Sequence, residues 1–125
     1  MAIVEHQAER GYGSPVHRHD RDDETFFVLD GELRIEVDGR ARAAGPGVAA
    51  FLPRKLTHAV AVTSAQARYL TFHTPAGWEE FALEVGTPDR PGTAPPADEL
   101  PPDPAALAEL ASSYGIEILG PPTPG

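Results

Sequence analysis

Three histidines and one glutamate are spaced in a way that suits a single bound metal ion. His17 and His19 lie two residues apart, so both imidazoles point to the same face of an extended strand. Glu24 follows a short polar break, and His58 comes from a later part of the chain. Three imidazoles and a carboxylate form a mixed nitrogen and oxygen ligand set. This set suits iron(II), nickel, cobalt, manganese or zinc better than calcium or magnesium, so we expect one divalent transition metal ion.

Two adjacent carboxylates compete for the fourth ligand position. Asp23 directly precedes Glu24, and alternation along the strand favours Glu24 because it shares a face with Phe26 and Val28. The other acidic residues of this segment are expected to form a solvated acidic loop: Asp20, Asp22 and Asp23.

Two histidines lie outside this ligand set. Arg68 is expected to face solvent, so alternation sends Tyr69 and His73 to the opposite face. If that face is the interior, His73 is a catalytic base or a substrate contact; otherwise it is a solvent-exposed histidine at a strand end. His6 is expected to be exposed. Five side chains are expected to line an apolar substrate pocket beside the metal: Phe26, Val28, Ile35, Val60 and Tyr69.

Composition limits the possible partners and location. The 125 residues suffice for one domain with a real core. The net charge of −9 disfavours nucleic acid and anionic membranes as partners but not a small-molecule substrate. The chain has no cysteine, which excludes disulfides and thiolate metal sites, and no signal-peptide pattern or membrane span is evident. We therefore expect a cytoplasmic protein.

Short strands must position the candidate ligands. Runs rich in β-branched and aromatic residues predict strands at 3–9, 16–19, 24–29, 33–38, 41–44, 48–52, 58–63 and 68–73. The pairs Asp30-Gly31 and Asp38-Gly39 predict tight turns. Many short strands separated by turns indicate an all-β antiparallel barrel or sandwich.

The pattern changes after residue 76. Apolar residues three and four apart predict a helix at 78–85, and Asp103-Pro104 predicts the start of a second helix, which ends at Gly115. A Pro-rich connector occupies 87–102, and 116–119 is an apolar extended segment. We expect residues 1–76 to form the barrel. Residues 77–125 are expected to form a helical, Pro-rich extension that packs on the barrel of its own chain or of a partner chain.

The two ligand-bearing stretches resemble the sequence motifs of the cupin superfamily. Gly11-x5-His17-x-His19-x4-Glu24-x6-Gly31 matches the first cupin motif at every fixed position. The second motif is matched in most positions by Gly47-x5-Pro53 followed by His58, although Lys55 stands where glycine is usual. The sequence around these motifs and the ending Gly115-Ile-Glu-Ile-Leu-Gly-Pro are similar to single-domain cupins of the quercetin dioxygenase-like group.

This resemblance implies a cupin-type β-barrel, also called a double-stranded β-helix or jelly roll, with a metal held by His17, His19, Glu24 and His58. The leading hypothesis is a dioxygenase acting on a flavonol-like or enol-bearing aromatic substrate, with Glu24 as both ligand and general base. A second is a non-oxidative isomerase, cyclase, dehydratase or decarboxylase in which His73 or Glu24 moves protons. A third is a non-catalytic module that binds a small molecule.

The start of the chain bears on its assembly. Only ten residues precede Gly11, whereas related single-domain cupins often carry a longer leader with an extra strand. The first strand is therefore expected to leave an unpaired edge, and such edges are usually covered. We expect a homodimer in which residues 2–10 or the C-terminal tail cross to the partner.

Overall fold

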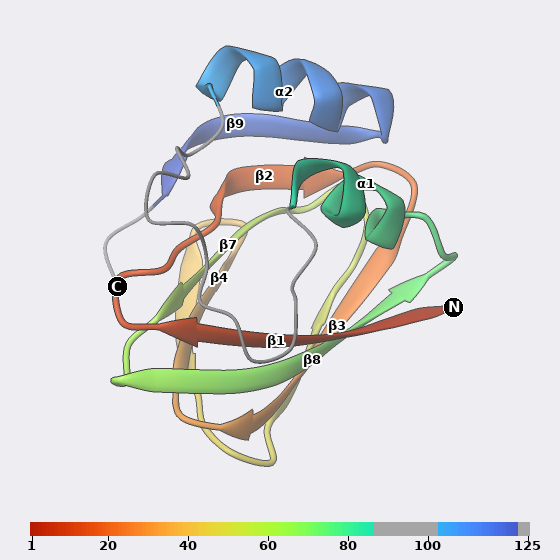
Figure 1. The fold of residues 1–125 in the computed structure, drawn as a ribbon. Helices are drawn as coiled ribbons and strands as arrows, with labels where there is room; N and C mark the ends of the chain where they lie inside the picture. Colours follow the sequence, from red (N-terminus) through yellow and green to blue (C-terminus); the bar gives the residue numbers. More distant parts are fainter. Residues whose placement is uncertain (87–102, 123–125) are drawn as a thin grey trace, which may run out of the picture.

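Two antiparallel sheets face each other and form a small barrel (Figure 1). The computed structural model describes residues 1–86 and 103–122. Each strand predicted before residue 76 is present, with its ends within two residues of those expected. The elements of the described residues are β1 (Ala2–Glu9), β2 (Pro15–His19), β3 (Asp23–Asp30), β4 (Leu33–Val37), β5 (Arg40–Ala44), β6 (Ala49–Leu52), β7 (Thr57–Val62), β8 (Gln66–Thr74), α1 (Trp78–Val85), α2 (Pro104–Ser113) and β9 (Ile116–Pro122).

The order of the strands confirms the antiparallel β-barrel. One sheet has the order β1-β8-β3-β6, and the other has the order β5-β4-β7-β2-β9. Neighbours in these orders are distant along the chain, since β8 joins β1 to β3 and β7 joins β4 to β2. The first strand lies at a sheet edge, as expected, and pairs with β8.

Alternation along the strands divides the interior into a polar end and an apolar end. Glu24 pairs with His73 across β3 and β8, and both side chains are buried. Four residues further along β3, Val28 pairs with the buried Tyr69. This step corresponds to about 13 Å of strand. The core cluster around Val28 includes Leu33 and Val62, so the barrel is closed by packed hydrocarbon at this end. The polar residues therefore gather at the other end.

A tight turn fixes the register of β4 and β5, and a sharp bend carries the chain from β3 to β4 in the other sheet. Asp38 and Gly39 both have positive φ, 51° and 81°, and Val37 pairs with Arg40, as in a two-residue type I′ hairpin. Gly31 has a φ of +78°, and a Cβ atom there would lie 2.2 Å from the carbonyl oxygen of Gln66. Only glycine fits that close approach. Both predicted turns are therefore present.

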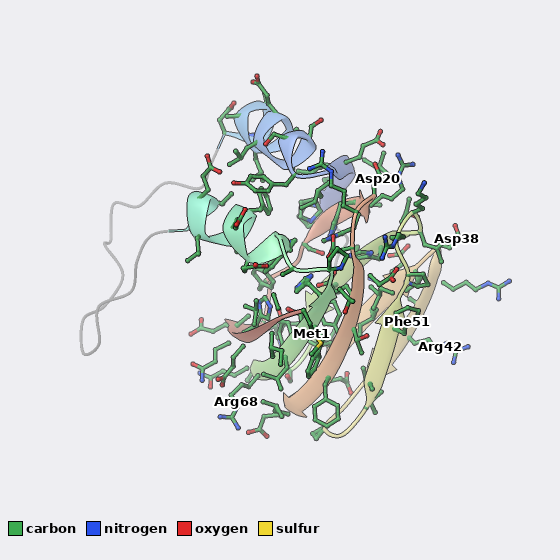
Figure 2. The ribbon with its side chains drawn as sticks, turned by 90° about the vertical axis from the view of Figure 1, so that its right-hand side faces the viewer. Met1, Asp20, Asp38, Arg42, Phe51 and Arg68 are labelled. Atoms are coloured by element: carbon green, nitrogen blue, oxygen red, sulfur yellow. The ribbon has the colours of Figure 1, made fainter. Side chains whose placement is uncertain are left out.

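The C-terminal extension contributes a strand to the barrel of its own chain. β9 pairs antiparallel with β2, and α2 packs on β9, while α1 lies between α2 and β1 (Figure 1). Arg18 of β2 forms an ion pair with Glu117, and the Asp20 N–H donates to the Gly115 carbonyl over 2.8 Å. Figure 2 shows Asp20 beside β9, whereas Arg42 projects into solvent from β5. The extension thus packs on the barrel of its own chain, with β9 as the edge strand next to β2.

Both predicted helices are present in the extension. The Asp103 side chain caps α2 by accepting a hydrogen bond from the Ala106 N–H over 3.1 Å. The apolar spacing places Val85 on the packed face of α1, but this residue is 37% exposed. The Pro-rich connector lies outside the described residues. Within the described ranges, neither helix is long and apolar enough to cross a lipid bilayer.

Candidate metal centre

Three strands from the two sheets bring the predicted ligands together at the polar end of the barrel. His17 and His19 lie on β2, and His17 is the cross-strand partner of His58 on β7. Glu24 lies near the start of β3 in the opposite sheet, and its side chain points inward. Three of these residues, His19, His58 and Glu24, are buried, and His17 is partly buried. All four predicted ligands therefore converge on one interior space.

The distances between ligand atoms suit one shared ion. The Nε2 atoms of His17 and His19 are 3.1 Å apart, and Glu24 Oε2 lies 3.3 Å from His58 Nε2 and 3.6 Å from His19 Nε2. Each of the three histidines offers a ring nitrogen within 4.8 Å of the other two. Ligands that bind a transition metal at about 2.0–2.2 Å have mutual separations in this range.

The protons on the histidine rings leave the inward nitrogens free. The His17 Nδ1–H donates to the Pro15 carbonyl over 2.7 Å, and the His19 Nδ1–H donates to Asp22 Oδ1 over 2.8 Å. In the neutral rings both Nε2 atoms therefore carry lone pairs, and these face each other at 3.1 Å. Two lone pairs at that distance repel each other unless a cation lies between them. The donor set thus fits a metal ion.

Unsatisfied polar atoms support the same assignment. Among the described residues, Glu24 Oε2 and His58 Nε2 are buried and have no hydrogen-bond partner. Buried polar atoms are normally paired, because an unpaired one costs about 1–3 kcal/mol. A metal ligated by both atoms removes that cost. His58 Nδ1 is also unpaired, and nothing in the structure explains this.

Burial and neighbouring charges set the ionisation of two ligands, His17 and Glu24, as metal binding requires. Burial, together with the nearby imidazoles of His58 and His19, lowers the pKa of His17 to about 3. Burial alone would raise the pKa of Glu24, but the imidazole of His58 at 3.3 Å and two other nearby imidazoles outweigh it, so the pKa lies below its usual value. For His19, burial lowers the pKa, but the hydrogen bond with Asp22 and the charge of Glu24 outweigh burial and raise it. At neutral pH the site therefore contains a neutral His17 and an ionised Glu24, both competent to bind a cation.

Asp22 is not the solvated loop residue that the sequence predicts, and this expectation is wrong. It is 7% exposed, and its two carboxylate oxygens accept from the Nδ1–H groups of His19 and His73 over 2.8 and 2.9 Å. Burial raises its pKa, but these two hydrogen bonds outweigh burial and hold the pKa below its usual range. Asp20 is exposed, as predicted, and Asp23 is partly buried. Asp23 forms an ion pair with Arg54, so Glu24 alone of the two adjacent carboxylates points inward.

His73 is fully buried beside the centre and is not the solvent-exposed histidine of the alternative hypothesis. Both of its ring nitrogens are engaged, Nδ1 with Asp22 and Nε2 with Thr71 Oγ1, each over 2.9 Å. The ring of Trp78, from α1, stacks on His73 with a centroid separation of 4.7 Å and an interplanar angle of 2°. His73, Asp22 and His19 form a second group that could hold a cation, although hydrogen bonds already pair these atoms.

The five predicted pocket residues are buried but not equally accessible. Phe26, Val28, Ile35 and Val60 belong with Tyr69 to one hydrophobic core cluster. Of the five, Tyr69 borders an open cavity of about 840 Å³, which is also lined by His6 and Tyr12. His6, expected to be exposed, is partly buried and stacks on Tyr69 with ring centroids 4.8 Å apart. The cavity therefore lies along β1, with His6 and Tyr69 in its wall.

The turn before β7 accommodates Lys55, which stands where the second motif usually has glycine. Lys55 adopts a φ of 73°, the left-handed conformation that glycine takes most readily. Its N–H donates to the His19 carbonyl over 2.7 Å, which ties the turn before β7 to the strand that carries two ligands. The turn is therefore kept at the cost of some backbone strain.

Comparison with known families accounts for this architecture. A family model described as the Cupin domain matches residues 4–73. The chain is a cupin. The match covers more than half of the sequence and includes His17, His19, Glu24 and His58.

Solved structures with the same fold cover the barrel of this cupin. KdgF from Halomonas sp. is 23% identical with a TM-score of 0.60, and the match covers 62% of this chain and 71% of that one. A cupin described as a sugar phosphate isomerase from Silicibacter pomeroyi is 27% identical with a TM-score of 0.54 and coverages of 59% and 50%. A predicted oxalate decarboxylase from Thermotoga maritima is 18% identical with a TM-score of 0.54 and coverages of 57% and 63%. A search of curated proteins found no match.

Proposed function

We propose that this cupin is a metal-dependent enzyme that ionises a hydroxyl- or enol-bearing substrate, with Glu24 as the general base. The proposal depends mainly on one observation. Glu24 is a buried carboxylate whose Oε2 has no hydrogen-bond partner among the described residues and lies 3.3 Å from His58 Nε2. An ionised oxygen in that position is an acceptor that must be satisfied by a ligand, a metal or a transferred proton.

His17, His19, Glu24 and His58 would hold one divalent ion of iron, nickel, cobalt, manganese or zinc. When bound, such an ion supplies Lewis acidity and, for a redox-active metal, access to dioxygen. His17 and His19 present Nε2 to it because Pro15 and Asp22 accept their Nδ1–H protons. Four protein ligands leave one or two positions of a five- or six-coordinate metal open.

Glu24 moves the proton in this proposal. Its lowered pKa keeps the carboxylate ionised at neutral pH. The substrate O–H bond breaks as the proton transfers to a Glu24 oxygen, and burial of the site excludes the water that would otherwise compete for that proton. His73 Nε2 is already engaged with Thr71 Oγ1 over 2.9 Å, so we assign the base role to Glu24 and propose that His73 does not act as a base.

A dioxygenase of the quercetin dioxygenase-like group is the first candidate. The interior beyond Glu24 along β3 is lined by aromatic or branched side chains, and Phe26 and Tyr69 stack there with ring centroids 5.6 Å apart. Such surroundings favour a flat substrate with a large apolar area, as in a flavonol or another enol-bearing aromatic, with dioxygen as co-substrate. The net charge of −9 favours an uncharged small molecule over nucleic acid as the partner. We also propose a cytoplasmic location.

A non-oxidative reaction is the second candidate. It is favoured by the structural neighbours described as a sugar phosphate isomerase and a predicted oxalate decarboxylase. Proton abstraction by Glu24 begins an isomerisation equally well, and no oxidant is then needed.

The test compares aerobic and anaerobic turnover of protein loaded with iron(II) or zinc on a panel of flavonols and hydroxy-carbonyl compounds. Oxygen-dependent turnover with iron supports the first candidate, and oxygen-independent turnover with zinc supports the second. Glu24→Gln should lower turnover by about 10²–10⁴-fold, whereas Glu109→Gln, at an exposed position of α2, should match the wild type. Equal turnover by Glu24→Gln contradicts the assigned base. Absence of turnover on the whole panel, together with tight binding of its members, indicates the non-catalytic module.

A further inference from the structure

A chain of hydrogen bonds links the open cavity to the metal centre. His6 Nε2 lies 2.9 Å from Thr71 Oγ1, and the same oxygen lies 2.9 Å from His73 Nε2. His73 Nδ1 is 2.9 Å from Asp22 Oδ2, and Asp22 Oδ1 is 2.8 Å from His19 Nδ1. The five residues come from β1, β8, β2 and the turn before β3, so the chain crosses both sheets.

With Asp22 as a carboxylate and every imidazole of the chain neutral, the chemistry of the groups fixes the direction of every hydrogen bond. Asp22 is ionised and accepts only, so His73 and His19 both place their protons on Nδ1. A neutral His73 then has a lone pair on Nε2, to which the Thr71 hydroxyl must donate. Thr71 has one proton, so its oxygen can only accept from His6, whose proton therefore lies on Nε2. Burial lowers the pKa of His6, which keeps that ring neutral as this arrangement requires.

Packing keeps these groups in place. Thr71 is 1% exposed and His73 is 0% exposed, so water cannot readily replace either partner. Trp78 stacks on His73, and Tyr69 stacks almost parallel to His6 with an interplanar angle of 5°. The outer end of the chain, His6, borders the cavity of about 840 Å³.

We propose that Asp22, His73, Thr71 and His6 act together as a positioning chain, which holds His19 as an Nε2 ligand and fixes the proton of His6 on Nε2 at the cavity. These residues act through His19 and do not contact the ion themselves. A group bound in the cavity thus meets His6 with Nδ1 as a hydrogen-bond acceptor. This inference rests on the metal centre of the proposed function, but the arrangement of protons can be measured without metal or substrate.

The first experiment locates the protons by ¹⁵N–¹H correlation spectroscopy of metal-free protein labelled on its five histidines. We expect the Nδ1–H tautomer for His17, His19 and His73 and the Nε2–H tautomer for His6. Thr71→Val keeps the branched shape but removes the hydroxyl, so His6 should become a mixture of tautomers. Thr71→Ser should restore the wild-type spectrum. An Nδ1–H tautomer of His6 in the wild type overturns the proposal, as does a Thr71→Val spectrum in which His6 is unchanged.

The second experiment examines the inner end of the chain through Asp22→Asn. The amide presents one donor and one acceptor to two Nδ1–H groups, so one histidine must change tautomer. If His19 changes, its Nε2 is blocked and zinc affinity should fall by about 10–100-fold, the usual cost of losing such a contact. If His73 changes, the chain reverses and His6 should move to Nδ1–H. Unchanged zinc affinity together with an unchanged His6 contradicts the proposal.

The two experiments separate this inference from the proposed function. If the wild type has the expected tautomers but binds none of the tested divalent ions, the metal-dependent function is contradicted and the positioning chain is not. If the protein binds zinc, and neither the zinc affinity nor the tautomers change in Thr71→Val and Asp22→Asn, the positioning chain is contradicted and the metal centre is not.

Discussion

Metal binding should raise the thermal stability of the folded protein, and the ligand histidines should account for the increase. A ligand that binds only the folded state at a free concentration of 100 Kd stabilises it by about 2.7 kcal/mol. The entropy of unfolding is about 2.1 cal/mol/K per residue near 60 °C. Over 125 residues this gives about 0.26 kcal/mol/K. The expected increase in Tm is therefore about 10 °C.

Replacement of one ligand tests the assignment. His58→Ala removes the imidazole nearest Glu24 Oε2. If this raises the Kd about a hundredfold, the same metal concentration equals the Kd of the variant and stabilises it by only about 0.4 kcal/mol, or 1–2 °C. Thermal melts can follow the fluorescence of Trp78, which is the single tryptophan of the chain and stacks on the site.

The comparison uses the metal-induced shift within each variant, because His58→Ala also opens a cavity that lowers the Tm of the metal-free protein. Arg42→Ala, at an exposed position of β5, serves as the control and should show the full shift (Figure 2). A shift in His58→Ala equal to that of the wild type refutes the reasoning. A wild-type Tm that stays unchanged with iron(II), nickel, cobalt, manganese and zinc alike refutes it as well.

Three further predictions concern stability and assembly. Since the folded pKa of His17 is about 3 and the unfolded value is 6.5, only the unfolded state gains this proton as pH falls from about 6.5 to about 3. His17 therefore lowers the free energy of unfolding of the metal-free protein by about 1.4 kcal/mol for each pH unit in this window. In urea unfolding with chelator present, the free energy of unfolding of His17→Gln should fall by about 2 kcal/mol less than that of the wild type between pH 7 and pH 5. Gly31→Ala places a methyl group against the Gln66 carbonyl at a φ of +78°, so it should lower the free energy of unfolding by about 1–3 kcal/mol. Gly45→Ala, which has open space around it, is the control in the same unfolding measurements. The homodimer remains a prediction, and a monomer in sedimentation velocity at micromolar concentration would contradict it.

The ligand set and the strands could be predicted because both depend on local patterns. The spacing of His17 and His19 and the alternation around Glu24 determine which way each side chain points once a strand forms. Two-residue turns such as Asp38-Gly39 determine where the strands reverse. These signals lie within a few residues of the groups that they position.

Asp22 could not be predicted because its environment is created by distant residues. In the sequence it is one of three aspartates in a polar run, and alternation does not apply in a turn. Its burial depends on His73, 51 residues later in the chain, and on His19. The sequence likewise predicts an apolar extended segment after Gly115 but not that β2 is its partner, because pairing between such distant segments leaves no local pattern.

The pairing of β9 with β2 bears on how a minimal version of this protein can be designed. The family model ends at residue 73, which invites a shortened chain that stops at the end of β8. Such a chain would lack β9 and would leave one edge of β2, the strand that carries His17 and His19, without backbone hydrogen-bond partners. An exposed edge of this kind can pair with a neighbouring molecule. A tag fused just beyond β9 would likewise adjoin the strand that pairs with β2, which carries two of the candidate ligands.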